Sequence, residues 1–177
     1  MGGLDRSSAR YLKEGGLNKD LLEEGKQAEK AMSGMDYEGA INHYDKILAR
    51  RPDLDEVWAY KGIALSFLQR NEEAWFCLSK ALEIRPDEGG NWDARQEFAL
   101  NLKNTDYFRK HVEDYLKYHN EETKSILLHA NAAIYFMKDY DFAIELCNRY
   151  LRIRPDDKHA KRLIEKALKK KSGKGWW

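Results

Sequence analysis

All three prolines of this chain occur in the same tripeptide, Arg-Pro-Asp, at residues 51–53, 85–87 and 154–156. The first two tripeptides are 34 residues apart, and the third follows 69 residues later, which is two such periods and one further residue. Each tripeptide ends an amphipathic run, and proline neither continues a helix nor favours helical angles in the residue before it. Helix ends at a fixed spacing indicate a repeat array, and this feature constrains the fold more than any other.

The segments between the tripeptides share a pattern of apolar and small residues. Steps of three and four residues place the members of the pattern on one face of each of two helices. Ala, Leu, Glu, Lys and Arg are abundant in these segments and favour helix. The small residues are expected where two antiparallel helices approach most closely. In the second period the pattern consists of Trp58, Gly62, Leu65, Ala74, Leu78, Ala81 and Pro86.

This pattern resembles the tetratricopeptide repeat (TPR) family, in which Trp-x-x-Leu-Gly-x-x-Tyr, Ala-x-x-x-Phe and a proline recur in a helix-turn-helix unit. The match covers about residues 20–156. It implies an all-α fold, a right-handed α-solenoid of four helix-turn-helix TPR-like repeats plus a C-terminal capping helix. The expected segments are an N-terminal extension at 1–19, repeats at 20–54, 55–88, 89–122 and 123–156, the capping helix at 157–171 and a flexible tail at 172–177.

The third repeat is degenerate. Gln96 and Phe108 replace the small residues of its two helices, and Asn120 stands at the place of the proline. Its first helix is expected at about 92–102, after two glycines. The fourth repeat has one residue more than the period, which we predict in the turn at 118–123.

Several classes of protein are not expected from this sequence. No apolar run approaches the roughly 18 residues that span a bilayer, and the N-terminal residues have no apolar signal-peptide core. Cys77 and Cys147 lie on apolar helical faces and are predicted to be buried thiols, which favours a reducing, cytoplasmic location. No metal-binding, phosphate-binding or catalytic motif occurs, so we expect no metal, no cofactor and no enzymatic activity.

The family resemblance implies that the first helices of the repeats line a concave groove for ligand peptides. Some family members hold a peptide carboxylate there with Lys, Asn and Arg, but the corresponding residues are Gly25, Glu29, Tyr60, Gly90 and Ala94. Binding of acidic tails by such a clamp is therefore not expected. The predicted lining contains apolar and aromatic side chains and four carboxylates, without Lys or Arg: Leu22, Glu29, Met32, Glu56, Ala59, Ile63, Phe67, Asp93, Glu97, Leu100, Leu128, Tyr135 and Phe136.

These residues predict a non-catalytic protein-protein interaction module, an adaptor or scaffold. Its partner would be a protein or peptide with Lys or Arg beside apolar anchors, because complementary charges steer association and apolar anchors supply affinity. The alternative for Phe67, Tyr135 and Phe136 is that they only pack between neighbouring helices, as aromatic residues at helical spacing often do.

Two other functions stay open. The first is self-assembly into a homo-oligomer, with a terminal segment such as Trp176-Trp177 in the groove of a neighbouring copy. The second, which we favour less, is nucleic-acid contact through the C-terminal end, where residues 148–174 carry 11 Lys or Arg against 3 Asp or Glu. A solvated, frayed end is the simpler interpretation of such a basic tail.

Overall fold

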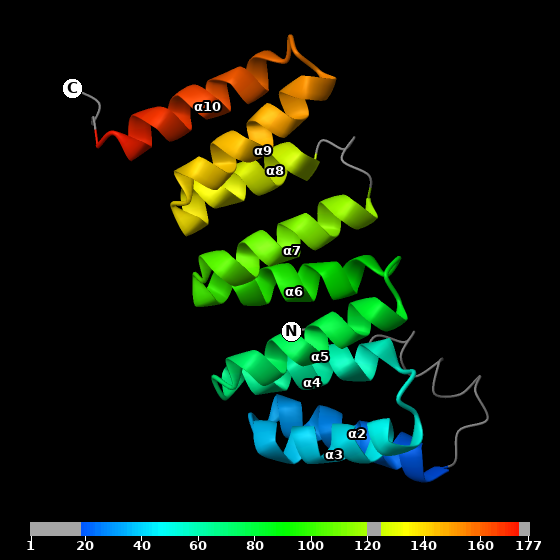
Figure 1. Ribbon diagram of the computed structural model, residues 1–177. Coiled ribbons are helices and arrows are strands. Elements are labelled where there is room, and N and C mark those ends of the chain that lie inside the picture. Colours follow the sequence, from blue (N-terminus) through cyan, green and yellow to red (C-terminus); the bar gives the residue numbers. More distant parts are fainter. Residues whose placement is uncertain (1–18, 120–124, 174–177) are drawn as a thin grey trace. The chain divides into compact units, whose positions relative to one another are not determined.

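The computed structural model of the chain describes residues 19–119 and 125–173 (Figure 1). The regular structure within these ranges is entirely helical, without a strand. The elements are α2 (Lys19–Ser33), α3 (Tyr37–Arg50), α4 (Asp55–Phe67), α5 (Asn71–Ile84), α6 (Gly89–Leu102), α7 (Thr105–Tyr118), α8 (Ser125–Ala132), the π-helix η1 (Ala133–Met137), α9 (Tyr140–Ile153) and α10 (Lys158–Lys171).

Most helices begin and end close to the residues that the repeat pattern predicts. Each Arg-Pro-Asp tripeptide follows directly on a helix end, at α3, α5 and α9. The prediction of a helix from 92 to 102 is wrong at its start, because α6 begins at Gly89. A tertiary contact stabilises this first turn despite its glycines: buried Asn91 donates a hydrogen bond to Asp55 of α4 at 2.9 Å.

A second period, which sequence reasoning missed, marks the turn inside each repeat. Each of these turns contains one non-glycine residue with positive φ, followed directly by the N-cap of the next helix. At Asp36, Asn104 and Asp139 the N-cap side chain accepts a hydrogen bond from a backbone N–H of the first turn. The residues with positive φ are Met35, Gln69, Lys103 and Lys138, at φ of 62°, 60°, 51° and 56°.

Two tryptophans form the same contact one repeat apart, which explains why tryptophan and proline recur together. The indole Nε1 of Trp58 donates a hydrogen bond to the carbonyl oxygen of Pro52 at 2.9 Å. The indole of Trp92 donates to Pro86 in the same way, at 2.8 Å. Each contact ties the start of one repeat to the tripeptide that ends the previous one.

The predicted close approach of two helices at a small residue is confirmed at Gly62. A Cβ atom on this residue would lie 2.8 Å from Cγ of Leu78 and 3.1 Å from the carbonyl oxygen of Ala74. Both distances are shorter than ordinary van der Waals contacts. The packing of α4 on α5 therefore requires glycine at this position.

The chain divides into two compact units, and the division falls between Phe98 and Ala99, inside α6 and inside the degenerate third repeat. In unit 1, whose described residues are 19–98, α3 packs against both α2 and α4, and α4 packs against α5. This unit buries a charged side chain with its partners. Asp55 is 2% exposed and lies 3.2 Å from Nη2 of Arg85, in addition to its bond with Asn91.

Unit 2, described over residues 99–119 and 125–173, has one continuous apolar core. Phe108, at the position of a small residue in the pattern, is fully buried and packs edge-on against Phe142 of α9. α10 packs against α9 and buries Ala160, Leu163 and Ala167. This is the arrangement expected of a helix that covers the apolar side of the last repeat.

The first helix of the fourth repeat contains a π-helical turn, whereas we predicted the extra residue of this repeat in the turn at 118–123. α8 continues into η1, and a π-helical turn contains one residue more than an α-helical turn. The positive-φ residue Lys138 follows Lys103 by 35 positions, so the extra residue precedes Lys138. Residues 120–123 of the predicted turn lie outside the described residues, so the place of the extra residue stays a prediction.

Candidate functional site

The four carboxylates of the predicted lining all lie in unit 1, on three different helices. Glu29 belongs to α2, Glu56 to α4, and Asp93 and Glu97 to the part of α6 before Ala99. Within the described part of the chain, none of the four forms an ion pair or a side-chain hydrogen bond. Glu29 and Glu56 are half-buried, and the two on α6 are exposed. These side chains therefore present negative charge that the described residues leave unneutralised.

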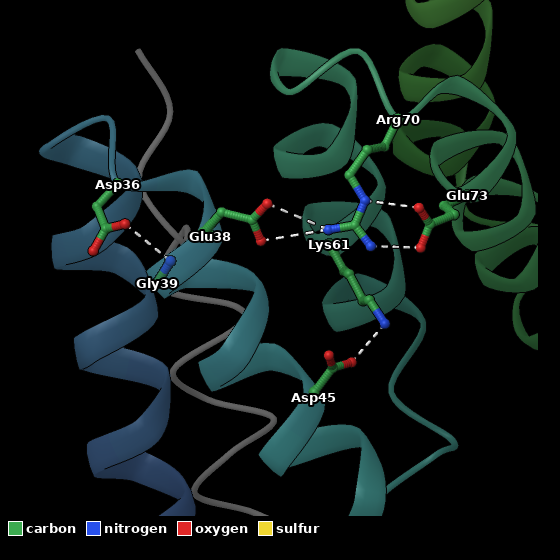
Figure 2. Close-up of polar contacts among 7 residues, drawn as sticks. All are labelled: Asp36, Glu38, Gly39, Asp45, Lys61, Arg70 and Glu73. Atoms are coloured by element: carbon green, nitrogen blue, oxygen red, sulfur yellow. Dashed lines mark hydrogen bonds and ion pairs between the residues drawn. The ribbon is translucent and has the colours of Figure 1, made fainter.

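Elsewhere in unit 1, most acidic side chains are paired. Figure 2 shows Arg70, in the turn between α4 and α5, bridging Glu38 of α3 and Glu73 of α5. In the same view Lys61 of α4 contacts Asp45 of α3 at 2.5 Å. These pairs connect consecutive helices by charge. Other acidic residues of unit 1 are paired within one helix or turn, or between helices. These ion pairs are Glu24 with Lys46, Asp53 with Arg51, Asp55 with Arg85, Glu83 with Lys80 and Glu88 with Arg85.

The apolar residues of the predicted lining in unit 1 differ in exposure. Ala59 is buried and presents little surface to a ligand, whereas Leu22, Met32 and Ile63 are half-buried. Phe67, at the end of α4, is 59% exposed although one face of its ring stacks on Tyr37 of α3, with 4.6 Å between ring centroids. Its other face is available to a partner.

In unit 2 the predicted lining is more exposed and its charge is different. Leu128, Tyr135 and Phe136, on α8 and η1, are 70%, 44% and 64% exposed. Two ammonium groups of α10 lie over the ring of Tyr135: Nζ of Lys166 is 4.8 Å and Nζ of Lys170 5.5 Å from the ring centroid. The prediction of a lining without Lys or Arg is therefore wrong for this residue, because α10 supplies cations that the first helices lack.

The remaining lining residue, Leu100, is half-buried and packs against the core of unit 2. The three aromatic residues do not behave as core residues, because more than two fifths of each side chain is exposed. Packing between helices alone thus fails to account for Phe67, Tyr135 and Phe136. Trp176 and Trp177, suggested as a self-assembly segment, lie outside the described residues.

A hollow of about 440 Å³ lies between α2 and α3. Its charged groups face one another: Nζ of Lys46 lies 3.1 Å from Glu24, and Arg50 lies 3.9 Å from Asp20. His43 also contacts Glu24, and the hydrogen bonds from His43 and Lys46 hold the pKa of this carboxyl below its usual value. Its charges are matched within the chain, so the hollow is a poor site for a charged ligand.

Unit 2 contains a cluster of histidine and aromatic side chains that sequence reasoning missed. His111 and Tyr115 of α7 contact His129 of α8, with ring centroids 5.7 and 4.9 Å from the imidazole. Both histidines are buried, and burial lowers the pKa of His129 to about 4. The spacing of His111, Tyr115 and His119 on one helical face was a signal in the sequence, but their contact with His129 depends on the packing of α7 and α8.

Over residues 19–119 and 125–173, no group of three or more His, Cys, Asp or Glu side chains has an arrangement that could hold a metal ion. In the same ranges, no helix combines the length and the apolar character that crossing a bilayer requires.

The sequence matches no protein-family model and no curated protein. The structure, however, is similar to solved structures of MamA proteins. One crystal structure of MamA is 16% identical, with a TM-score of 0.56, over 86% of this chain and 82% of that one. MamA from Desulfovibrio magneticus RS-1, from residue 41 to its end, is 13% identical, with a TM-score of 0.54, over 90% of this chain and 99% of that one. At these identities the likeness concerns the fold, an all-α repeat solenoid of the TPR-like type.

Proposed function

We propose that this chain is a non-catalytic protein-interaction module, and that unit 1 binds a basic segment of a partner protein. The observation that carries the proposal is the set of four carboxylates, Glu29, Glu56, Asp93 and Glu97, that lack a counter-charge among the described residues. A helical repeat offers a preformed surface, so binding does not have to order it. The half-exposed ring of Phe67 and the side chain of Ile63 supply apolar contacts for such a segment.

The cysteines support the cytoplasmic location that belongs to this proposal. Cys77 and Cys147 are buried and form no disulfide. Burial raises the pKa of both thiols to about 11, so neither is a reactive thiolate at neutral pH. Their role is that of small apolar core residues, as in proteins of a reducing compartment.

Peptide titration tests the proposal. A fluorescent peptide with Lys and Arg around an aromatic residue is titrated with the full chain, and a peptide with Glu in place of the basic residues is the comparison. The variant Glu56→Lys with Glu97→Lys is expected to weaken binding of the basic peptide by about tenfold, which corresponds to 1.4 kcal/mol. The salt dependence of binding should fall with it, since fewer charges attract the peptide.

The chain offers a matched control for this experiment. Glu72 and Asp87 also lie in unit 1, are exposed, and lack an ion pair among the described residues, but neither belongs to the predicted lining. Glu72→Lys with Asp87→Lys changes the net charge by the same amount. If both double variants weaken binding equally, or if Glu56→Lys with Glu97→Lys leaves binding of the basic peptide unchanged, the proposed site is wrong.

A further inference from the structure

The side chains around η1 form a second surface, distinct from the acidic residues of unit 1. We define the C-terminal patch as Leu128, Tyr135 and Phe136 of α8 and η1 together with Lys166 and Lys170 of α10. Tyr135 and Phe136 follow Leu128 by two helical turns, which places the three apolar side chains on one side of the helix. Each of them is far more exposed than a core residue.

The C-terminal patch differs from the equivalent position of the second repeat in its stacking partner. Phe136 precedes Lys138 by two residues, as Phe67 precedes Gln69, so the two phenylalanines occupy equivalent positions. Phe67 is partly covered by Tyr37, two residues after the positive-φ residue of the preceding repeat. The residue at that position before Phe136 is Thr105, which has no ring to stack. π-helical turns are rare and occur frequently at functional sites.

The charges at the C-terminal patch determine which partner it suits. Lys166 and Lys170 direct their ammonium groups over the ring of Tyr135, an arrangement in which a cation is attracted to the aromatic face. In the described part of the chain neither lysine forms an ion pair, although Lys171 of the same helix pairs with Asp141. α10 as a whole carries seven Lys or Arg and one Glu. Two unneutralised cations thus lie over Tyr135, one of the three exposed side chains on this side of the helix.

From this arrangement we propose that the C-terminal patch binds an acidic segment of a partner protein, in which Asp or Glu flank an apolar anchor. The anchor contacts Leu128 and Phe136, and the carboxylates approach Lys166 and Lys170. A bilayer surface with anionic lipids offers similar charge, but α10 buries its apolar stripe, Ala160, Leu163 and Ala167, against the protein. A helix that lies in a membrane interface uses that stripe for insertion, so a peptide is favoured as the occupant.

The experiment is fluorescence anisotropy with the full chain and a labelled acidic peptide that contains Leu and Phe between Glu residues. Lys166→Glu with Lys170→Glu is expected to weaken binding about tenfold, as loss of 1.4 kcal/mol would do. The control is Lys158→Glu with Arg162→Glu, an exposed pair on the same helix with the same spacing and charge change. This control should retain at least half of the affinity.

Phe136→Ser tests the apolar contact, because it removes an exposed ring without a change of charge. It is expected to weaken binding while the circular dichroism and melting temperature stay as in the wild type. Three outcomes would overturn the proposal: equal loss in both charge variants, no loss with Phe136→Ser, or an equal loss for a matched basic peptide in the Lys166→Glu with Lys170→Glu variant. Binding to phosphatidylserine vesicles in the absence of peptide binding would assign the patch to a membrane surface instead.

Discussion

Units 1 and 2 bury polar side chains of different kinds. In unit 1 the carboxylate of Asp55 contacts Arg85 and Asn91, so a buried charge has a counter-charge and a hydrogen bond. In unit 2 the imidazole of His129 lies against aromatic and histidine rings, and its Nε2 has no hydrogen-bond partner among the described residues. The buried carboxylate of Asp55 thus keeps its charge with specific partners, whereas burial of His129 favours the uncharged imidazole.

The first helices of the repeats show a related contrast. α4 is α-helical from Asp55 to Phe67, and the helix at the same place in the fourth repeat ends in the π-helical turn of η1. Both are followed by a residue with positive φ, Gln69 or Lys138, that directs the chain into the second helix. The repeat pattern therefore sets where the helices end, while the helical geometry just before that end differs between the two units.

Removal of the buried carboxylate of unit 1 should have the largest effect. Asp55→Ala removes the buried carboxylate that contacts Arg85 and Asn91, and loss of one member of a buried pair costs about 3–5 kcal/mol. Urea unfolding followed by tryptophan fluorescence measures this, because Trp58, Trp75 and Trp92 all lie in unit 1. Asp53→Ala is the control: its pair with Arg51 is exposed, and such pairs contribute at most about 1 kcal/mol. Equal losses in the two variants would contradict the role of Asp55.

Acid should destabilise unit 2 through His129. The folded pKa is about 4, against 6.5 for the unperturbed imidazole, so the unfolded chain binds a proton that the folded protein does not. Stability is therefore complete above pH 6.5 and falls as the pH is lowered towards 4, by about 3 kcal/mol at 1.36 kcal/mol per pH unit.

Hydrogen exchange of peptides from α7 and α8, measured across this pH range, reports the loss. His129→Phe should remove the pH-dependent part, since phenylalanine does not titrate. His159 is exposed on α10 and provides the control, so His159→Ala should leave the pH dependence unchanged. If His129→Phe and the wild type lose the same stability on acidification, a group other than His129 causes the pH dependence.

The glycine at the α4–α5 crossing should be the next most sensitive position. Gly62→Ala places a methyl group 2.8 Å from Leu78, and forced overpacking of this kind costs about 1–3 kcal/mol. Gly89→Ala is the matched control, because no atom lies within 4 Å of its added Cβ. It should stabilise α6 by up to about 1 kcal/mol through helix propensity. Thermal unfolding of both variants measures these changes in stability. A stabilising Gly62→Ala would show that α4 and α5 move apart to accept the methyl group.

The positive-φ residues should give the smallest effect, and the same effect in both units. Gln69→Gly and Lys138→Gly relieve the cost of a left-handed conformation and should each stabilise by up to about 1 kcal/mol. Leu68, the residue before Gln69, has φ of −86°, so Leu68→Gly should destabilise instead. Melting temperatures of the three variants test this, and a gain in one unit only would mean that the two turns differ in strain.

Sequence alone determined most of the helical framework. The tripeptides at 51–53, 85–87 and 154–156 predicted where second helices end, and Gly62 predicted a close crossing. These features are local: proline stops a helix wherever it stands, and a helical period of small residues is visible along one chain. The start of α6 was predicted three residues late, because Asn91 obtains its partner from α4, far away in the sequence.

Tertiary structure decided what the side chains do between the helices. Whether Glu56 meets a cation, whether Lys166 lies over Tyr135, and whether His129 is buried depend on contacts between separate helices. The π-helical turn of η1 was not predicted, because a count of residues alone does not distinguish an extra residue in a turn from one in a helix. Periodicity shows which face of a helix is apolar, but the partner of each charge is set only when the helices come together in space.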